Sequence, residues 1–156
     1  MRLLFKEKLF SWFDDYDIYD ENGNVVFTVE GKLAWGHCFK IYDRYGNELG
    51  MLKEKVFSFL PVFEIYINGM LVGSIKKEFT FFKPKFSLNF NNWTVDGNFF
   101  EWDYTVYDGN REIMTVSKEL MHLSDTYILD IYNEENVLAG LLIALAIDAE
   151  KCSRGD

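Results

Sequence analysis

The longest apolar run of the chain lies near its C-terminus, at residues 137–147, where the sequence reads VLAGLLIALAI. Glu134 and Glu135 precede this run and Lys151 follows it, which is the order of charges that a helix dipole favours. Leucine, alanine and isoleucine suit a helix, and no proline interrupts the run. The pattern therefore predicts a helix from about residue 134 to residue 149, roughly 24 Å long at 1.5 Å per residue.

The predicted helix is apolar on every face and is short. Its apolar part would span about 16 Å, whereas crossing a bilayer core of roughly 30 Å takes about 20 apolar residues. A helix on a protein surface would carry a polar stripe, and this one has none. We therefore expect a helix that is surrounded by protein.

Upstream of the helix, short apolar segments alternate with a recurring polar turn. The turn reads DENGN at residues 20–24 and DRYGN at residues 43–47, and related versions occur at residues 68–69, 96–98, 108–110 and 130–136. Asp and Asn followed by Gly between apolar runs are the strongest short signals for a hairpin. We predict about eleven strands, at residues 15–19, 25–31, 36–42, 48–55, 62–67, 71–78, 85–90, 92–95, 102–107, 111–118 and 126–131.

An open sheet of that many antiparallel strands would expose costly edges, and closed barrels of this size around a central helix exist. The alternative is a smaller lipocalin-like barrel, but its helix packs outside and should be amphipathic. The pattern favours an all-β fold with one helix, a closed antiparallel barrel wrapped around the apolar C-terminal helix. We expect residues 1–156 to form a single domain.

Composition supports a β-rich protein of the cytoplasm. Aromatic residues make up 18% of the chain, with 15 Phe and 9 Tyr, and these are strand-forming residues. The net charge of −9 argues against nucleic-acid binding. Cys38 and Cys152 are the only cysteines, which favours a reducing compartment. The charges of Lys6, Glu7 and Lys8 interrupt the N-terminal apolar run, so we do not expect a signal peptide.

Candidate chemistry is sparse. His122, Ser124 and Asp125 are too close in sequence to form a triad unaided, and no Gly-x-Ser-x-Gly motif is present. His37 and Cys38 are strand neighbours that should point to opposite faces. The two His and two Cys lack the paired spacing of a zinc site, and no phosphate-binding glycine loop occurs. We expect no catalytic residue, no metal site and no cofactor.

Two acidic features are interpreted structurally. Asp148 ends the apolar run, so a buried Asp148 must be paired, with a strand lysine or with backbone N–H groups, as an anchor of the helix. The densest acidic run is interpreted as a solvated edge strand and its turn; it comprises Asp14, Asp15, Asp17, Asp20 and Glu21.

The basic residues are distributed unevenly. Residues 51–90 contain six Lys and three Glu, a net charge of +3, so the remainder of the chain carries −12. Four phenylalanines, at positions 79, 81, 82 and 86, surround the second half of this lysine cluster. Lysines beside exposed aromatic residues suit an anionic lipid surface. The candidate lipid-binding residues are Lys53, Lys55, Lys76, Lys77, Lys83 and Lys85.

Several motifs, in order along the chain, resemble the LURP-one-related proteins of the Tubby C-terminal-like superfamily, which includes the phospholipid scramblases. They are FSFLP at 57–61, EIYING at 64–69, IKKEFT at 75–80, FKPK at 82–85 and LIALAIDA at 142–149. The resemblance implies a barrel of about twelve strands with the C-terminal helix along its axis. Tubby domains bind phosphoinositides and scramblases are membrane-associated. The calcium role of scramblases is not implied, because no loop of spaced acidic residues is present.

Two functions remain open. The first is a non-enzymatic cytosolic module that docks on anionic phospholipid at the membrane periphery through the six lysines. The second is a structural or interaction scaffold whose partner is another protein, with no lipid role. Lysines clustered on one outer face would favour the first function, and lysines dispersed or paired with glutamates would favour the second.

Overall fold

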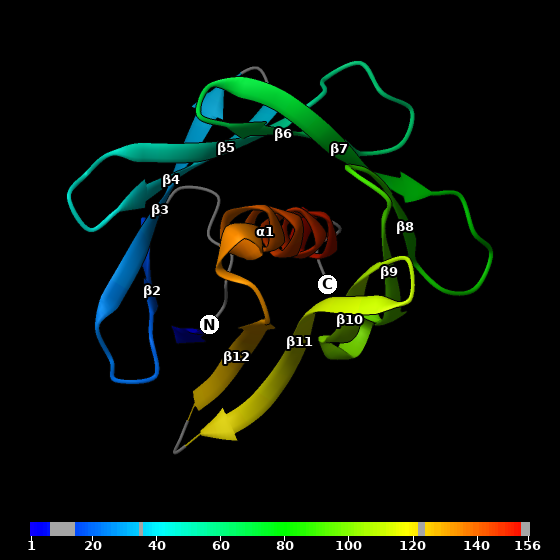
Figure 1. The fold of residues 1–156 in the computed structure, drawn as a ribbon. Helices are drawn as coiled ribbons and strands as arrows, with labels where there is room; N and C mark the ends of the chain where they lie inside the picture. The colour runs from blue at the N-terminus through cyan, green and yellow to red at the C-terminus, as the bar shows by residue number, and fades with distance from the viewer. Residues whose placement is uncertain (7–14, 35, 122–123, 154–156) are drawn as a thin grey trace.

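The computed structural model describes residues 1–6, 15–34, 36–121 and 124–153. A single antiparallel sheet of twelve strands curls around one helix, as the sequence pattern predicts (Figure 1). The strands are β1 (Arg2–Lys6), β2 (Tyr16–Tyr19), β3 (Val25–Ala34), β4 (Gly36–Asp43), β5 (Glu48–Glu54), β6 (Val62–Ile67), β7 (Met70–Glu78), β8 (Lys85–Asn89), β9 (Trp93–Asn98), β10 (Asp103–Asp108), β11 (Arg111–Met121) and β12 (Ser124–Ile131).

The sheet is a meander that is closed on one side by its first and last strands. The order is β8-β7-β6-β5-β4-β3-β2-β1-β12-β11-β10-β9. Each pair of neighbouring strands is consecutive in sequence, except for β1 and β12. No ladder joins β8 to β9 among the described strands, and the barrel is therefore nearly closed. The predicted strand list began at residue 15 and lacked β1, which no Asp-Gly or Asn-Gly turn adjoins in the sequence.

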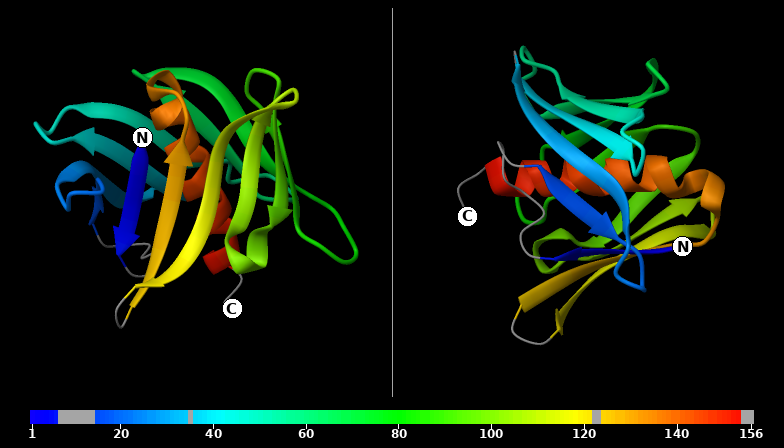
Figure 2. Two further views of the ribbon diagram at one scale, coloured as in Figure 1. Left: turned by 60° about the horizontal axis from the view of Figure 1, so that its bottom comes forward. Right: turned by 90° about the vertical axis from the view of Figure 1, so that its left-hand side faces the viewer.

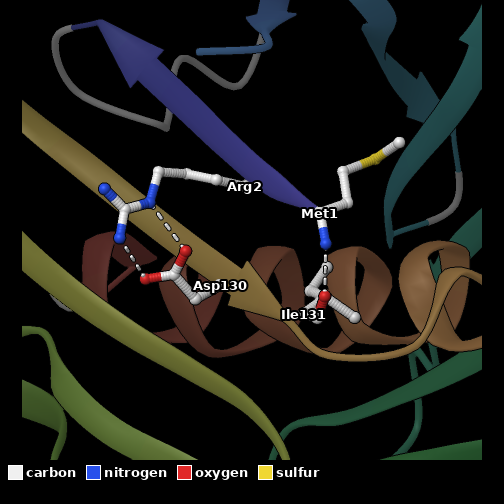
Figure 3. A network of polar contacts seen from close by, with 4 residues as sticks. All are labelled: Met1, Arg2, Asp130 and Ile131. Carbon is white, nitrogen blue, oxygen red and sulfur yellow. Dashed lines mark hydrogen bonds and ion pairs between the residues drawn. The ribbon is translucent and has the colours of Figure 1, made fainter.

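The contact between β1 and β12 is reinforced by polar bonds at its end (Figure 3). The Arg2 guanidinium donates two hydrogen bonds to the Asp130 carboxylate, from Nε to Oδ1 at 2.7 Å and from Nη2 to Oδ2 at 3.0 Å. The amino group of Met1 donates to the carbonyl of Ile131 at 2.6 Å. These bonds hold together segments that are about 130 residues apart in the chain.

The acidic run does not form an edge strand, which corrects our interpretation of it. Strand β2 lies between β3 and β1 inside the sheet. Asp17 is exposed on β2 and accepts a hydrogen bond from the Thr28 hydroxyl at 3.0 Å. Asp20 belongs to the turn that follows, whereas Asp14 lies outside the described residues.

Most of the recurring turns have the geometry that their sequences predict. The turn predicted at residues 96–98 is wrong, because these residues belong to β9 and Gly97 pairs with Tyr104 of β10. In the β2–β3 turn, Asp20 Oδ1 accepts from the backbone N–H groups of Asn22 and Asn24, and Gly23 has a φ of 81°. In the β4–β5 turn, Asp43 accepts from the N–H of Asn47 in the same way. Hydrogen bonding to the charged carboxylate lowers the pKa of both aspartates.

The C-terminal helix α1 (Val137–Ser153) runs through the interior of the barrel (Figures 1 and 2). A short 3-10 turn (Glu134–Asn136) precedes it, and the Asn133 side chain accepts from the N–H of Glu135 to begin that turn. Every residue from 139 to 150 is buried, which confirms the prediction of a helix surrounded by protein. The helix extends four residues further than predicted.

Glycines allow the helix and the sheet to approach closely on two sides. A Cβ atom on Gly50 of β5 would lie 3.1 Å from Leu142 Cδ1 and 3.2 Å from the Tyr66 carbonyl oxygen. A Cβ atom on Gly140 of α1 would lie 2.9 Å from the sulfur of Met114 on β11. Since core packing leaves little slack, these positions fix how closely α1 packs against the sheet.

We predict that Leu142→Lys unfolds the domain. The Leu142 side chain is fully buried, so the change deletes a core leucine and buries an unpaired ammonium, at a cost of about 4 kcal/mol or more. Thermal unfolding followed by circular dichroism measures the effect. The matched control is Leu71→Lys on the exposed side of β7, which should leave the melting temperature nearly unchanged. Unchanged melting of the Leu142 variant would contradict the central-helix architecture.

Candidate functional site

The antiparallel meander sorts its connections to two ends of the barrel. The Asp- and Asn-containing turns lie at the end where α1 begins, close to the N-terminus (Figure 2). At the other end, where α1 finishes, lie the β5–β6 connection (residues 55–61) and the β7–β8 connection (residues 79–84). We call these two connections the aromatic loops. Their position follows from topology, since every second connection of a meander must return to the same end.

Five phenylalanines on the aromatic loops are exposed to solvent to an unusual degree. Phe57 and Phe59 are 99% and 95% exposed, and Phe79, Phe81 and Phe82 are 67%, 85% and 95% exposed. Single exposed apolar residues are normal on proteins, but a contiguous group of large ones marks an interaction surface.

Phe86 does not belong to this group, which corrects its placement beside the lysines. It faces inward from β8, is only 7% exposed, and packs its ring edge-on against Phe99 at 5.0 Å between centroids.

A groove of about 360 Å³ separates the two loops. Phe59 and Leu60 line one wall, and the β7–β8 loop from residue 79 to residue 84 lines the other. Lys77 and Glu78, at the end of β7, complete the lining. Figure 2 (left) shows the β7–β8 loop, in green, projecting from the barrel.

Five of the six predicted lysines are exposed beside these loops, and we call them the lysine face: Lys53, Lys55, Lys76, Lys83 and Lys85. The backbone N–H of Lys55 bonds the carbonyl of Val62, and Val62 is opposite Lys76 in the β6–β7 ladder. Lys55 and Lys76 are thus one strand apart, on the order of 10 Å at normal strand spacing. Within the described part of the chain, none of the five lysines forms an ion pair.

Two glutamates lie within the lysine face. Glu64 is the register partner of Lys53 on β6, and Glu78 is the register partner of Lys85 on β7. The Ser87 hydroxyl donates to Glu78 at 2.6 Å. The lysines therefore cluster on one outer side of the sheet, but two carboxylates reduce the positive charge of the cluster.

Lys77 is placed differently from the other five lysines and does not belong to the lysine face. It lies two residues after the buried Ile75, on the same inward face of β7, and its Nζ lies 2.7 Å from Oε1 of Glu150 on α1. The two side chains are 11% and 2% exposed. Because the Lys77 ammonium is buried in this ion pair, it is not presented on the outer face to a phosphate group.

The polar contact that ties the helix to a strand is the ion pair of Lys77 with Glu150. Asp148 is buried, with 1% of its surface exposed, which is the condition under which the sequence analysis expected it to pair with a strand lysine or with backbone N–H groups. The strand lysine Lys77 pairs instead with Glu150, a residue that the sequence analysis did not single out. Burial, together with the nearby Asp148 carboxylate, raises the pKa of the Tyr104 hydroxyl well above its usual value. The sequence feature that could have identified Glu150 is its position just after the apolar run, about one turn before the end of α1.

The remaining candidate residues do not form a catalytic group in the described structure. The Nδ1 atom of His37 contacts the Glu54 carboxylate. Cys38 is buried, and burial raises the pKa of its thiol, which makes it a poor nucleophile. His122 lies outside the described residues. Among the described residues, no group of three or more His, Cys, Asp or Glu side chains converges as metal ligands do.

The described part of the chain has no helix that combines the length and the apolar character needed to span a membrane. The buried helix α1 has 17 residues, which agrees with the length argument made from the sequence.

Comparison with known proteins confirms the family resemblance. The family model of LURP-one-related proteins matches residues 1–148. The uncharacterised protein YxjI of Bacillus subtilis is 36% identical over 149 residues, which cover 95% of this chain and 92% of YxjI. The X-ray structure of an Arabidopsis thaliana protein superposes with a TM-score of 0.61 at 17% identity, covering 98% of this chain and 90% of the plant protein. The plant structure supports the fold alone.

We predict that Lys77→Met destabilises the protein by about 3–5 kcal/mol, because it leaves the Glu150 carboxylate buried without the Lys77 ammonium. The double variant Lys77→Met with Glu150→Leu should recover most of that loss, since it replaces both charges by apolar groups. Urea unfolding measures each step.

The neighbouring Lys76→Met is the control for this prediction, and it should change the free energy of unfolding by less than about 0.5 kcal/mol because Lys76 is exposed. Equal effects at positions 76 and 77 would show that the ion pair does not anchor the helix.

Proposed function

The chain belongs to the LURP-one-related family, and from this premise and the surface just described we propose that it is a non-enzymatic module that docks on anionic phospholipid surfaces. The observation that carries the proposal is the group of five exposed phenylalanines on two adjacent loops, bordered by the lysine face. Apolar side chains at the tip of a fold with lysines beside them fit the chemistry of a bilayer interface, which is anionic outside and apolar beneath.

The lysines alone would give weak binding. Each lysine near an anionic membrane surface contributes about 1 kcal/mol, and Glu64 and Glu78 oppose this attraction. The phenylalanines supply the second contribution, since full burial of one such side chain is worth about 1.5–3 kcal/mol. We therefore expect binding that depends on anionic lipid and weakens with salt, and that also requires the aromatic loops.

The positions of the lysine face and the aromatic loops favour one orientation of the barrel on the membrane. Exposed acidic side chains occur at both ends: Glu21, Glu134 and Glu135 where α1 begins, and Glu101 and Asp103 at the β9–β10 connection where α1 finishes. The orientation therefore rests on the lysine face and the aromatic loops, which an anionic surface would attract, so the protein would approach with the C-terminal end of α1 toward the lipid.

A protein partner is the second candidate function. The observation that favours it is the pairing in register of Lys53 with Glu64 and of Lys85 with Glu78. Mixed charges around an aromatic centre are typical of protein–protein interfaces as well. A protein that binds no vesicle would be assigned to this class.

We predict salt-sensitive co-sedimentation with phosphatidylglycerol-containing vesicles and none with pure phosphatidylcholine vesicles. Changing Lys55 and Lys83 to Glu should weaken binding at low salt at least tenfold, because two attractive charges become repulsive. The matched control changes Arg44 and Arg111 to Glu, which alters the net charge equally at the opposite end of the barrel.

At physiological salt, where the Debye length is about 8 Å, the control should bind within about twofold of the unchanged protein, since charges at the far end of the barrel are then screened from the membrane. Equal losses in the two variants would reduce the effect to net charge alone. Absence of binding at low salt, where electrostatic attraction is strongest, would end the lipid proposal.

A further inference from the structure

The groove between the aromatic loops is large enough to hold part of a lipid molecule. We propose that it takes up a single acyl chain of an anionic membrane lipid, with the head group of that lipid held near Lys83. This inference rests on the proposed docking function and adds to it a defined binding site for one lipid molecule.

The size and the lining of the groove suit an acyl chain. Its volume of about 360 Å³ falls at the lower end of the range for small-molecule sites. Six of the ten lining residues are Phe, Leu or Pro: Phe59, Leu60, Phe79, Phe81, Phe82 and Pro84. Three of these rings, those of Phe59, Phe81 and Phe82, are at least 85% exposed to solvent. They lie at the end of the barrel that would face the lipid under the docking proposal.

Each wall of the groove is shaped by contacts within its own loop. In the β5–β6 loop, the Ser58 hydroxyl donates to the carbonyl of Leu60 at 2.5 Å. In the β7–β8 loop, the Thr80 hydroxyl donates to the carbonyl of Lys83. The rings of Phe79 and Phe81 meet edge to face in the same loop, with 5.4 Å between centroids. A groove shaped before binding loses less entropy when a flexible chain enters it.

The charges around the groove leave one cation to meet a head group. The ammonium of Lys77 is neutralised by Glu150. The carboxylate of Glu78 keeps its negative charge, and its register partner, the exposed Lys85, offsets that charge on the outer face of the sheet. Lys83 is exposed and has no ion-pair partner among the described residues. The structure thus combines a groove with aromatic walls and an exposed lysine without an ion-pair partner at its rim, an arrangement that suits an anionic amphiphile.

The test uses sodium decanoate below its micelle-forming concentration, so that an acyl chain is offered without a bilayer. We expect saturable binding by isothermal titration calorimetry and weaker binding of decyltrimethylammonium, which has the same chain length and the opposite charge. Phe59→Asp should lower the affinity for decanoate at least tenfold, because it places a carboxylate in the wall of the groove.

Phe57→Asp is the matched control. Phe57 lies on the same loop with the same exposure but does not line the groove, so its change should alter decanoate affinity less than twofold. Lys83→Gln should lower decanoate affinity, and Lys55→Gln, on the lysine face outside the groove, should not. Thermal melting verifies that each variant is folded.

The possible failures are distinguishable. Vesicle binding without saturable decanoate binding would overturn the acyl-chain site and leave the docking function in place. Decanoate binding without vesicle binding would overturn membrane docking. It would also overturn the proposal that the acyl chain in the groove belongs to a membrane lipid. Equal losses in the two phenylalanine variants, or equal affinity for the cationic amphiphile, would show unspecific adsorption. Saturable binding of an apolar peptide by a protein that does not bind decanoate would overturn the acyl-chain site and assign the groove to a protein ligand.

Discussion

The burial of a helix that is apolar on all sides is the constraint on which the structure depends. A helix of this kind has no face that water tolerates, so protein must surround it completely. Twelve strands supply that surrounding, and residues 139–150 are accordingly buried without exception. The sheet and the helix approach closely at Gly50 on one side and at Gly140 on the other, where an added Cβ atom would lie 3.1 Å from Leu142 and 2.9 Å from Met114. The ion pair of Lys77 with Glu150 then ties the far end of the helix to β7 at an interior position.

The same constraint determines where a binding surface can form. Because the interior is filled by α1, any ligand must be met at the outer side or at the ends of the barrel. The meander places the Asp- and Asn-containing hairpin turns at one end and the aromatic loops at the other. A chain with a net charge of −9 thereby presents lysines and exposed phenylalanines together at a single end. This separation supports the proposed docking and gives it a direction.

Lys77 links the core to the candidate site. It lines the groove between the aromatic loops, yet its ammonium is bonded to the central helix. One residue is thus part of both the anchored core and the lining of the groove. The neighbouring Lys76, one residue away, faces the outside. The alternation of strand side chains separates a structural lysine from a surface lysine, although the two are adjacent in the sequence.

The sequence by itself determined the central helix, the turns and most strands, because these depend on local composition: an uninterrupted apolar run and Asp or Asn followed by Gly. It also located the lysine-rich segment, since charge can be counted. Only the tertiary structure decided that β1 pairs with β12, that Phe86 and Lys77 point inward, and that Glu150 is buried. These features depend on register and on contacts between residues far apart in the chain. A shift of one residue moves a strand side chain to the opposite face, and the groove exists only because folding brings two loops from separate hairpins side by side.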